Sequence, residues 1–111
     1  MNLVNLNIMK YKIFQIPFPK TSEEEKIYLK YAFTSLNRID KVHFEYYVKT
    51  YEGEIETSEK DIPEILEEIF TMLNINHPIN YKGHSLSVSD ICEIDNKYYF
   101  CDSFGWKEIN I

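Results

Sequence analysis

The stretch from Asp61 to Leu73 constrains the fold of this chain more than any other. Its apolar residues recur at the i, i+3, i+4, i+7 spacing of one helix face. They are Ile62, Ile65, Leu66, Ile69, Phe70 and Leu73. Asp61 can cap the helix, and Pro63 is tolerated in its first turn. Because the apolar face must be buried against another element, the sequence predicts a helix that packs on a second layer.

That second layer is predicted from short segments rich in β-branched and aromatic residues. Strands are expected at Lys10–Ile16, Val42–Tyr51, Asp90–Ile94, Lys97–Cys101 and Trp106–Ile109. A turn at Glu52-Gly53 would lead into a short return strand at Glu54–Glu56. A first helix is expected to have Ser22 as its cap and Glu25 in a capping box, and to end near Asn37. The predicted fold class is α+β, with two helices packed on a small, mostly antiparallel sheet that includes a C-terminal hairpin.

The chain of 111 residues has the length of one domain. Met9 opens a second plausible start, so we expect residues 1–8 to be an N-terminal extension and residues 9–111 to be the domain. The N-terminus lacks the basic region of a signal peptide, and no apolar run approaches the roughly 18 residues of a membrane span. We therefore expect a cytoplasmic protein, in a bacterial host cell, without a membrane partner.

The two cysteines flank a predicted hairpin, and its register bears on their pairing. If Asp95-Asn96 form the turn, Cys92 lies opposite Tyr99. Cys101 then lies diagonally from Cys92, at roughly 7–8 Å. A disulfide needs Cα atoms about 5.5–6 Å apart. The sequence therefore predicts two free thiols.

Negative charge is concentrated in one short region. The net charge of the chain is −6, and residues 52–68 hold eight carboxylates against Lys60 alone. A nucleic-acid binder would instead show a basic patch, so direct nucleic-acid binding is not expected. The region suits a partner with a basic surface, or it is a solvated face that aids solubility. The candidate partner-binding residues are Glu52, Glu54, Glu56, Glu64, Glu67 and Glu68.

A second group of residues has side chains of the kinds that act in catalysis or bind metals. His84 could act with Ser85, or Cys101 with Asp102 and a distant histidine, but no nucleophile elbow or phosphate loop organises them. The serines and aspartates are explained more simply by turns and strand ends. The histidines and cysteines lack the spacing of a metal site. We therefore predict no catalytic residue, no metal and no cofactor.

Two motifs in the last third of the chain point to a family. The stretch "YKGHSLSVSDICEI", followed by "NKYYFCDSFGWKEI", resembles the signature of YodL-type domains, which occur in Gram-positive bacterial mobile elements and in large polyvalent phage and plasmid proteins. The resemblance implies an α+β domain, a mobile-element setting and no known catalytic residue. It gives the motif residues an architectural role. These residues are Gly83, His84, Ser85, Ser87, Asp90, Asp102, Ser103, Gly105 and Trp106.

Two classes of function follow from these features. The first is a small non-enzymatic protein that binds and blocks a host defence protein of basic surface, such as a CRISPR effector nuclease, in the manner of anti-CRISPR or anti-restriction proteins. The second is an accessory module that docks on another mobile-element protein or forms a homodimer through exposed aromatics such as Tyr46, Tyr47 and Tyr51. An enzyme that uses His84 with Cys101 or Ser85 is the least favoured alternative.

Overall fold

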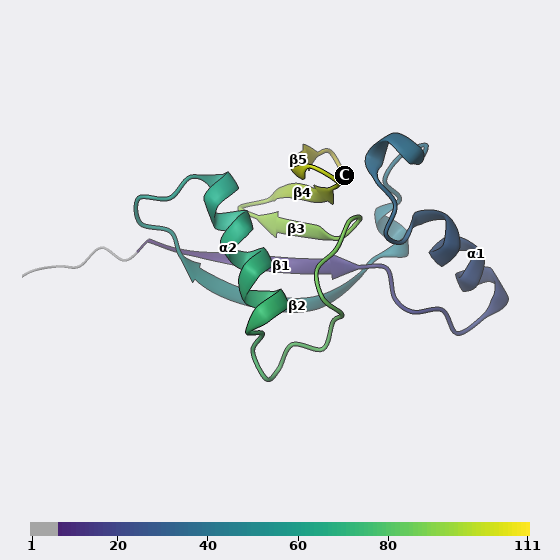
Figure 1. Cartoon of the computed structure of the whole chain (residues 1–111), viewed down its shortest axis with the longest axis horizontal. Helices are drawn as coiled ribbons and strands as arrows, with labels where there is room; N and C mark the ends of the chain where they lie inside the picture. The colour runs from purple at the N-terminus through teal and green to yellow at the C-terminus, as the bar shows by residue number, and fades with distance from the viewer. Residues whose placement is uncertain (1–6) are drawn as a thin grey trace, which may run out of the picture.

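Figure 1 shows the computed structural model of the chain, which describes residues 7–111. Five antiparallel strands form one sheet in the order β2-β1-β3-β4-β5, so β1 lies inside the sheet and β2 and β5 are its outer strands. This confirms the α+β class. The elements are β1 (Ile8–Gln15), α1 (Ser22–Tyr31), two short 3-10 helices (Leu36–Arg38 and Phe44–Tyr46), β2 (Val48–Glu56), α2 (Ile62–Ile75), β3 (Ile91–Ile94), β4 (Lys97–Asp102) and β5 (Gly105–Ile109).

Helix α2 packs across one face of the sheet, as its periodicity predicted (Figure 1). The Asp61 side chain accepts a hydrogen bond of 2.9 Å from the Glu64 N–H, which confirms the predicted cap. The helix buries Ile65, Leu66, Ile69 and Leu73. The sheet supplies the other half of this core, chiefly Tyr11, Ile13, Ile55, Cys92, Ile94 and Tyr99.

The β3–β4 hairpin also follows the sequence. Asp95 and Asn96 form its turn with φ angles of 53° and 62°, the left-handed conformation that a two-residue type I′ turn requires. Cys92 lies opposite Tyr99, as the predicted register has it. Cys92 and Cys101 are both buried and both free.

The first helix differs from the prediction at both ends. Thr21, not Ser22, is the cap, and its hydroxyl accepts a hydrogen bond of 3.1 Å from the Glu24 N–H. The helix ends at Tyr31, so the predicted end near Asn37 is wrong. Figure 1 shows α1 beyond the end of the sheet, and Tyr31 is its one buried residue.

The region after α1 corrects the prediction further. Residues 42–47 are not a strand, because the chain there includes a 3-10 helix whose Phe44 packs on Phe14, with ring centroids 4.9 Å apart. The predicted Glu52-Gly53 turn is wrong as well, since β2 runs unbroken along β1, with Gly53 opposite Tyr11. A β-carbon on Gly53 would lie 2.8 Å from the Tyr11 hydroxyl oxygen, so this glycine accommodates a ring rather than a turn.

The N-terminal boundary of the domain also differs from the prediction. Ile8, placed in the extension by the sequence, pairs with Glu56 as the first residue of β1. Residues 1–6 of the predicted extension lie outside the described residues. No helix in the described part of the chain is long and apolar enough to cross a membrane.

Candidate functional site

The signature stretch from Gly83 to Asp90 runs into β3 beside the end of β1, and its centre is a buried carboxylate. Asp90 is 1% exposed. Its Oδ2 accepts hydrogen bonds from Gln15 Nε2 at 3.0 Å and from the Ser87 N–H at 2.9 Å. Burial raises the pKa of the Asp90 carboxyl to about 6, although the bond from Gln15 and the nearby His84 ring both lower it. Asp90 thus ties the loop to the sheet.

His84 contacts the residues around Asp90 mainly through its main chain. Its carbonyl oxygen accepts hydrogen bonds from Gln15 Nε2, at 3.0 Å, and from the Tyr81 hydroxyl. The ring Nδ1 lies 2.7 Å from the main-chain oxygen of Ser85 and 3.9 Å from Asp90 Oδ2. Because a carbonyl can only accept, the proton is assigned to Nδ1. The ring is partly exposed and lies against Phe33, with centroids 5.5 Å apart.

Gly83 has a role that is specific to a glycine. A β-carbon at this position would lie 2.1 Å from Gln15 Oε1 and 2.9 Å from the Tyr81 hydroxyl oxygen. Gln15 is itself 1% exposed and held by its Nε2 bonds, so it has little freedom to move away. The motif glycine is therefore explained by close packing of the loop on β1.

Ser89 ties the same stretch to two other parts of the chain. Its hydroxyl accepts a hydrogen bond of 2.9 Å from the Phe33 N–H, and its carbonyl accepts one of 2.7 Å from the Tyr47 hydroxyl. Its own N–H donates to the Cys101 carbonyl at 2.8 Å. The loop is thereby fixed to β4 and to the segment that follows α1. Together with Gln15, Tyr81, Gly83, His84, Ser87 and Asp90, Ser89 makes up what we call the signature network.

The second motif builds the β4–β5 turn. Asp102 Oδ1 accepts hydrogen bonds from the main-chain N–H groups of Leu36, at 3.2 Å, and Ser103, at 2.9 Å. Gly105 has a φ of 81°, where a side chain would be strained. Trp106 packs against Phe70 of α2, with ring centroids 6.5 Å apart. Ser103 and Ser85 are exposed.

The geometry gives little support to a nucleophile in these motifs. The His84 ring contacts the main-chain oxygen of Ser85 rather than its hydroxyl. Burial raises the pKa of the Cys101 thiol to about 12, which disfavours the reactive thiolate. Among residues 7–111 there is no group of three or more His, Cys, Asp and Glu side chains that could hold a metal ion.

The candidate glutamates of α2 point to solvent, as predicted. Glu64, Glu67 and Glu68 are exposed on the side of the helix away from the core. Glu68 forms an ion pair of 2.7 Å with Lys60. Among the described residues, no ion pair involves Glu64 or Glu67. We call these three residues the α2 acidic face.

The candidate glutamates of β2 lie on the opposite face of the sheet. Since side chains alternate along a strand and Ile55 faces the core, Glu52, Glu54 and Glu56 face away from α2. The α2 glutamates therefore do not continue the array of Glu52, Glu54 and Glu56 on β2. Nor is the array purely acidic, because Lys10 lies opposite Glu54 and Lys12 opposite Glu52.

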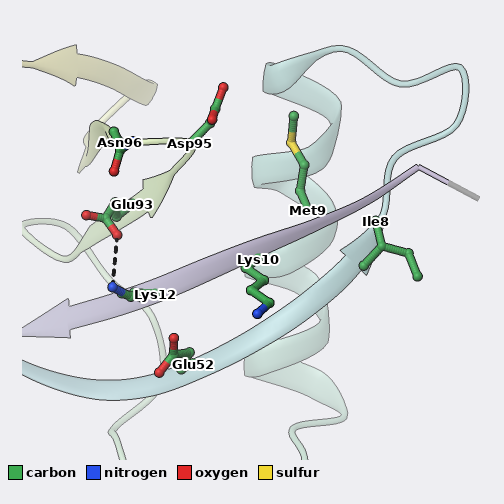
Figure 2. Close-up of a pocket in the computed structure, with 8 residues that line it drawn as sticks. All are labelled: Ile8, Met9, Lys10, Lys12, Glu52, Glu93, Asp95 and Asn96. Atoms are coloured by element: carbon green, nitrogen blue, oxygen red, sulfur yellow. Dashed lines mark ion pairs between the residues drawn. The ribbon is translucent and has the colours of Figure 1, made fainter.

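Figure 2 shows the mixed charge of this open face. Lys12 pairs with Glu93 of β3 at 3.5 Å. Glu52 pairs with Lys49 at 3.0 Å. Lys12, Glu52 and Glu93 border a hollow of about 420 Å³ that Ile8 and Met9 also line. A surface of alternating charge is a weaker match to a basic partner than the α2 acidic face.

The aromatics proposed as an interface are not exposed. Tyr47 is half-buried and bonded to Ser89. Tyr46 packs on Tyr31, with centroids 5.4 Å apart, and Tyr51 packs on Tyr81 at 5.6 Å. The prediction of exposed tyrosines at these positions is therefore wrong.

Sequence reasoning missed the part that Gln15, Tyr81 and Tyr47 take in holding the signature loop. Gln15 carried a usable signal, because it follows Tyr11 and Ile13 at alternate positions of one strand. A polar residue on the apolar side of a strand needs a buried partner. Tyr81 and Tyr47 gave no comparable signal, since they lie in irregular segments without a period.

Comparisons with known proteins agree with the motif evidence. The family model of the YodL-like domain matches residues 10–111. The chain is also similar to an uncharacterized protein of Acanthamoeba polyphaga mimivirus, with 40% identity over 58% of this chain and 69% of the relative. No solved structure matches the chain.

Proposed function

The chain belongs to the YodL-like domain family, and from this premise we propose that it is a non-enzymatic protein of a mobile genetic element that binds and blocks a host defence protein. The observation that carries the proposal is the α2 acidic face, which is exposed on a helix anchored by its opposite side. The partner would be a protein with a basic surface, of the kind that restriction or CRISPR nucleases use to hold nucleic acid. A viral relative fits a mobile-element setting.

The physical basis is electrostatic. A helix fixes the backbone positions of its glutamates, so binding has to order only the side chains themselves. A basic nucleic-acid channel attracts such an array as it attracts phosphates. Asp61, Glu64, Glu67 and Glu68 outnumber the neighbouring Lys60 at the start of α2, which favours attraction of a basic partner to this end of the helix.

The signature network supports a non-enzymatic function. Most of its polar groups bond to one another, although the buried Gln15 Oε1 has no hydrogen-bond partner among residues 7–111, and Cys101 is buried with a raised pKa. A catalytic nucleophile would need a base within hydrogen-bond reach and access to substrate. The network is better suited to fixing the loop than to chemistry.

A second candidate is self-association or docking on another mobile-element protein. It is favoured by the two outer strands, because neither β2 nor β5 has a further strand on its outer edge within residues 7–111. Val48 of β2 is also 45% exposed. Salt dependence separates the candidates, since binding through the α2 acidic face should weaken as salt is added and strand pairing should not.

The proposal is tested by transformation efficiency in strains that carry an active restriction or CRISPR system. Expression of the wild-type protein should raise the number of transformants obtained with a targeted plasmid. The triple variant Glu64→Lys, Glu67→Lys, Glu68→Lys should lose this effect, because like charges across an interface cost several kcal/mol. The matched control reverses Glu52, Glu54 and Glu56, with the same change in net charge on the opposite face. Wild-type protein without effect in strains of either type would contradict the proposal.

A further inference from the structure

A groove of about 580 Å³ lies between the first half of α2 and the C-terminal hairpin. Its apolar lining comes from both sides, with Ile62 and Leu66 from α2, Tyr99 from β4 and Trp106 from β5. Trp106 is half-buried, so part of its ring is open to a ligand. Phe104, at the tip of the turn, also lines the groove and is 91% exposed. The groove therefore offers apolar surface that the fold has not used.

The rim of the groove carries more negative than positive charge. Glu67 contributes a carboxylate from α2 and Glu108 contributes one from β5, while Lys97 is the cation among the lining residues. Glu108 lies opposite Tyr99 in the sheet and on the same side of β5 as Trp106. Glu67 also belongs to the α2 acidic face, so the groove and that face are continuous.

The groove lies beside the outer edge of the sheet. Beyond β5 no further strand is present among residues 7–111, so the outer backbone edge of β5 can receive an extended chain. In an extended chain every second side chain points to the same side. A segment laid along β5 would thus direct alternate side chains into the groove and past its carboxylates.

We propose that this groove binds an extended segment of a partner protein whose groove-facing side chains, at every second residue, include both apolar residues and lysine or arginine. The apolar side chains would contact Trp106 and Phe104, and the cations would pair with Glu67 and Glu108. This inference rests on the proposed function, because it assigns the chemistry of the basic partner. It adds a binding site that the α2 carboxylates alone do not define.

The test uses Trp106 as a reporter, since it is the single tryptophan of the chain. The probe is a short peptide that carries leucine and lysine in turn at every second residue, with serine between them, and the control peptide has glutamate in place of lysine. Tryptophan emission of the full chain should change saturably with the lysine peptide and not with the glutamate peptide. The double variant Glu67→Lys, Glu108→Lys should bind the lysine peptide at least about tenfold more weakly. Both residues are exposed, so the variant should fold.

A matched control reverses Glu23 and Glu25, two exposed residues of α1, and should bind like the wild type. Equal binding of the two peptides, no binding of the lysine peptide, or wild-type affinity in the double variant would each overturn the groove proposal. If transformation efficiency still depends on the α2 glutamates in that case, the proposed function stands and the groove alone is excluded. If expression of the wild-type chain leaves transformation efficiency unchanged while the lysine peptide binds as expected, the groove proposal stands and a defence protein is excluded as the partner.

Discussion

The signature network and the α2 acidic face use polar residues in opposite ways. In the network, Asp90 and Gln15 are almost fully buried and bond to groups of the same chain. On α2, Glu64 and Glu67 reach into solvent, and the described residues form no ion pair with them. The motif residues from Gly83 to Asp90 therefore hold the loop in place, whereas the α2 side chains that remain available for a partner lie outside that stretch. A recognisable motif and a binding surface need not coincide.

The two regions should also differ in energetic cost. Breaking a buried hydrogen bond leaves its partner unsatisfied, which costs about 1–3 kcal/mol. Changing an exposed charge usually shifts the free energy of unfolding by only about 0.5 kcal/mol. Substitutions in the network should thus reduce stability, and substitutions on α2 should alter binding at nearly unchanged stability.

The largest effect is expected for Gly83→Ala. The new methyl group would overlap Gln15 Oε1, which lies 2.1 Å from the β-carbon position, and would push Gln15 away from Asp90. We expect a loss of about 2–3 kcal/mol in the free energy of unfolding, measured by denaturant titration. Gly105→Ala is the control, because it meets no atom within 4 Å and tests only the strain of a φ of 81°. It should cost about 1 kcal/mol. A Gly83→Ala protein as stable as the wild type would show that the loop does not pack on β1 as described.

A smaller effect is expected from the ionisation of Asp90. Its folded-state pKa, about 6, lies above its ordinary value of 3.8 because the carboxyl is buried. The folded state thus holds the proton more tightly than the unfolded chain, so this contribution to stability is present below the ordinary pKa. It is lost as pH rises through the folded pKa. The stability of the wild type relative to Asp90→Asn should therefore fall by about 2 kcal/mol between pH 4 and pH 7.

The measurement for Asp90 is denaturant unfolding of both proteins across this pH range. Most other titratable groups are common to the two proteins, so the difference between them reports mainly on Asp90. A difference that stays constant with pH would mean that Asp90 is not buried, and the network would lose its centre.

The sequence predicted the parts of the fold whose causes are local. The α2 helix follows from apolar periodicity and the Asp61 cap, and the β3–β4 turn follows from Asp95-Asn96. The exposure of the α2 glutamates follows from the same periodicity, because they lie opposite the apolar face of the helix. The end of α1 was missed because it depends on Phe33, which has a φ of 59° and donates its N–H to Ser89, far along the chain. Pairing across such a separation leaves no trace in the local sequence.

The same distinction applies to β2 and to the candidate site. Gly53 suggested a turn, but it is explained by the Tyr11 ring of the neighbouring strand. The glutamates of β2 and of α2 are close in sequence, yet they lie on opposite faces because Ile55 faces the core. Which face a side chain occupies depends on the register of the sheet, which residues 52–68 alone do not reveal.

The central claim is that the α2 acidic face contacts the partner while the signature network supports the fold. The most direct test is to capture the host protein on the wild-type chain, by pull-down from a lysate of a defence-positive host, and to measure its affinity for two variants of the chain. One is the triple variant Glu64→Lys, Glu67→Lys, Glu68→Lys, and the other is His84→Ala, which keeps the main-chain bonds of His84 to Gln15 and Tyr81. We predict that the triple variant folds, by circular dichroism, and binds at least about a hundredfold more weakly, while His84→Ala binds like the wild type. A triple variant with wild-type affinity, together with loss of binding in a folded His84→Ala protein, would contradict the account and place the contact at the signature loop.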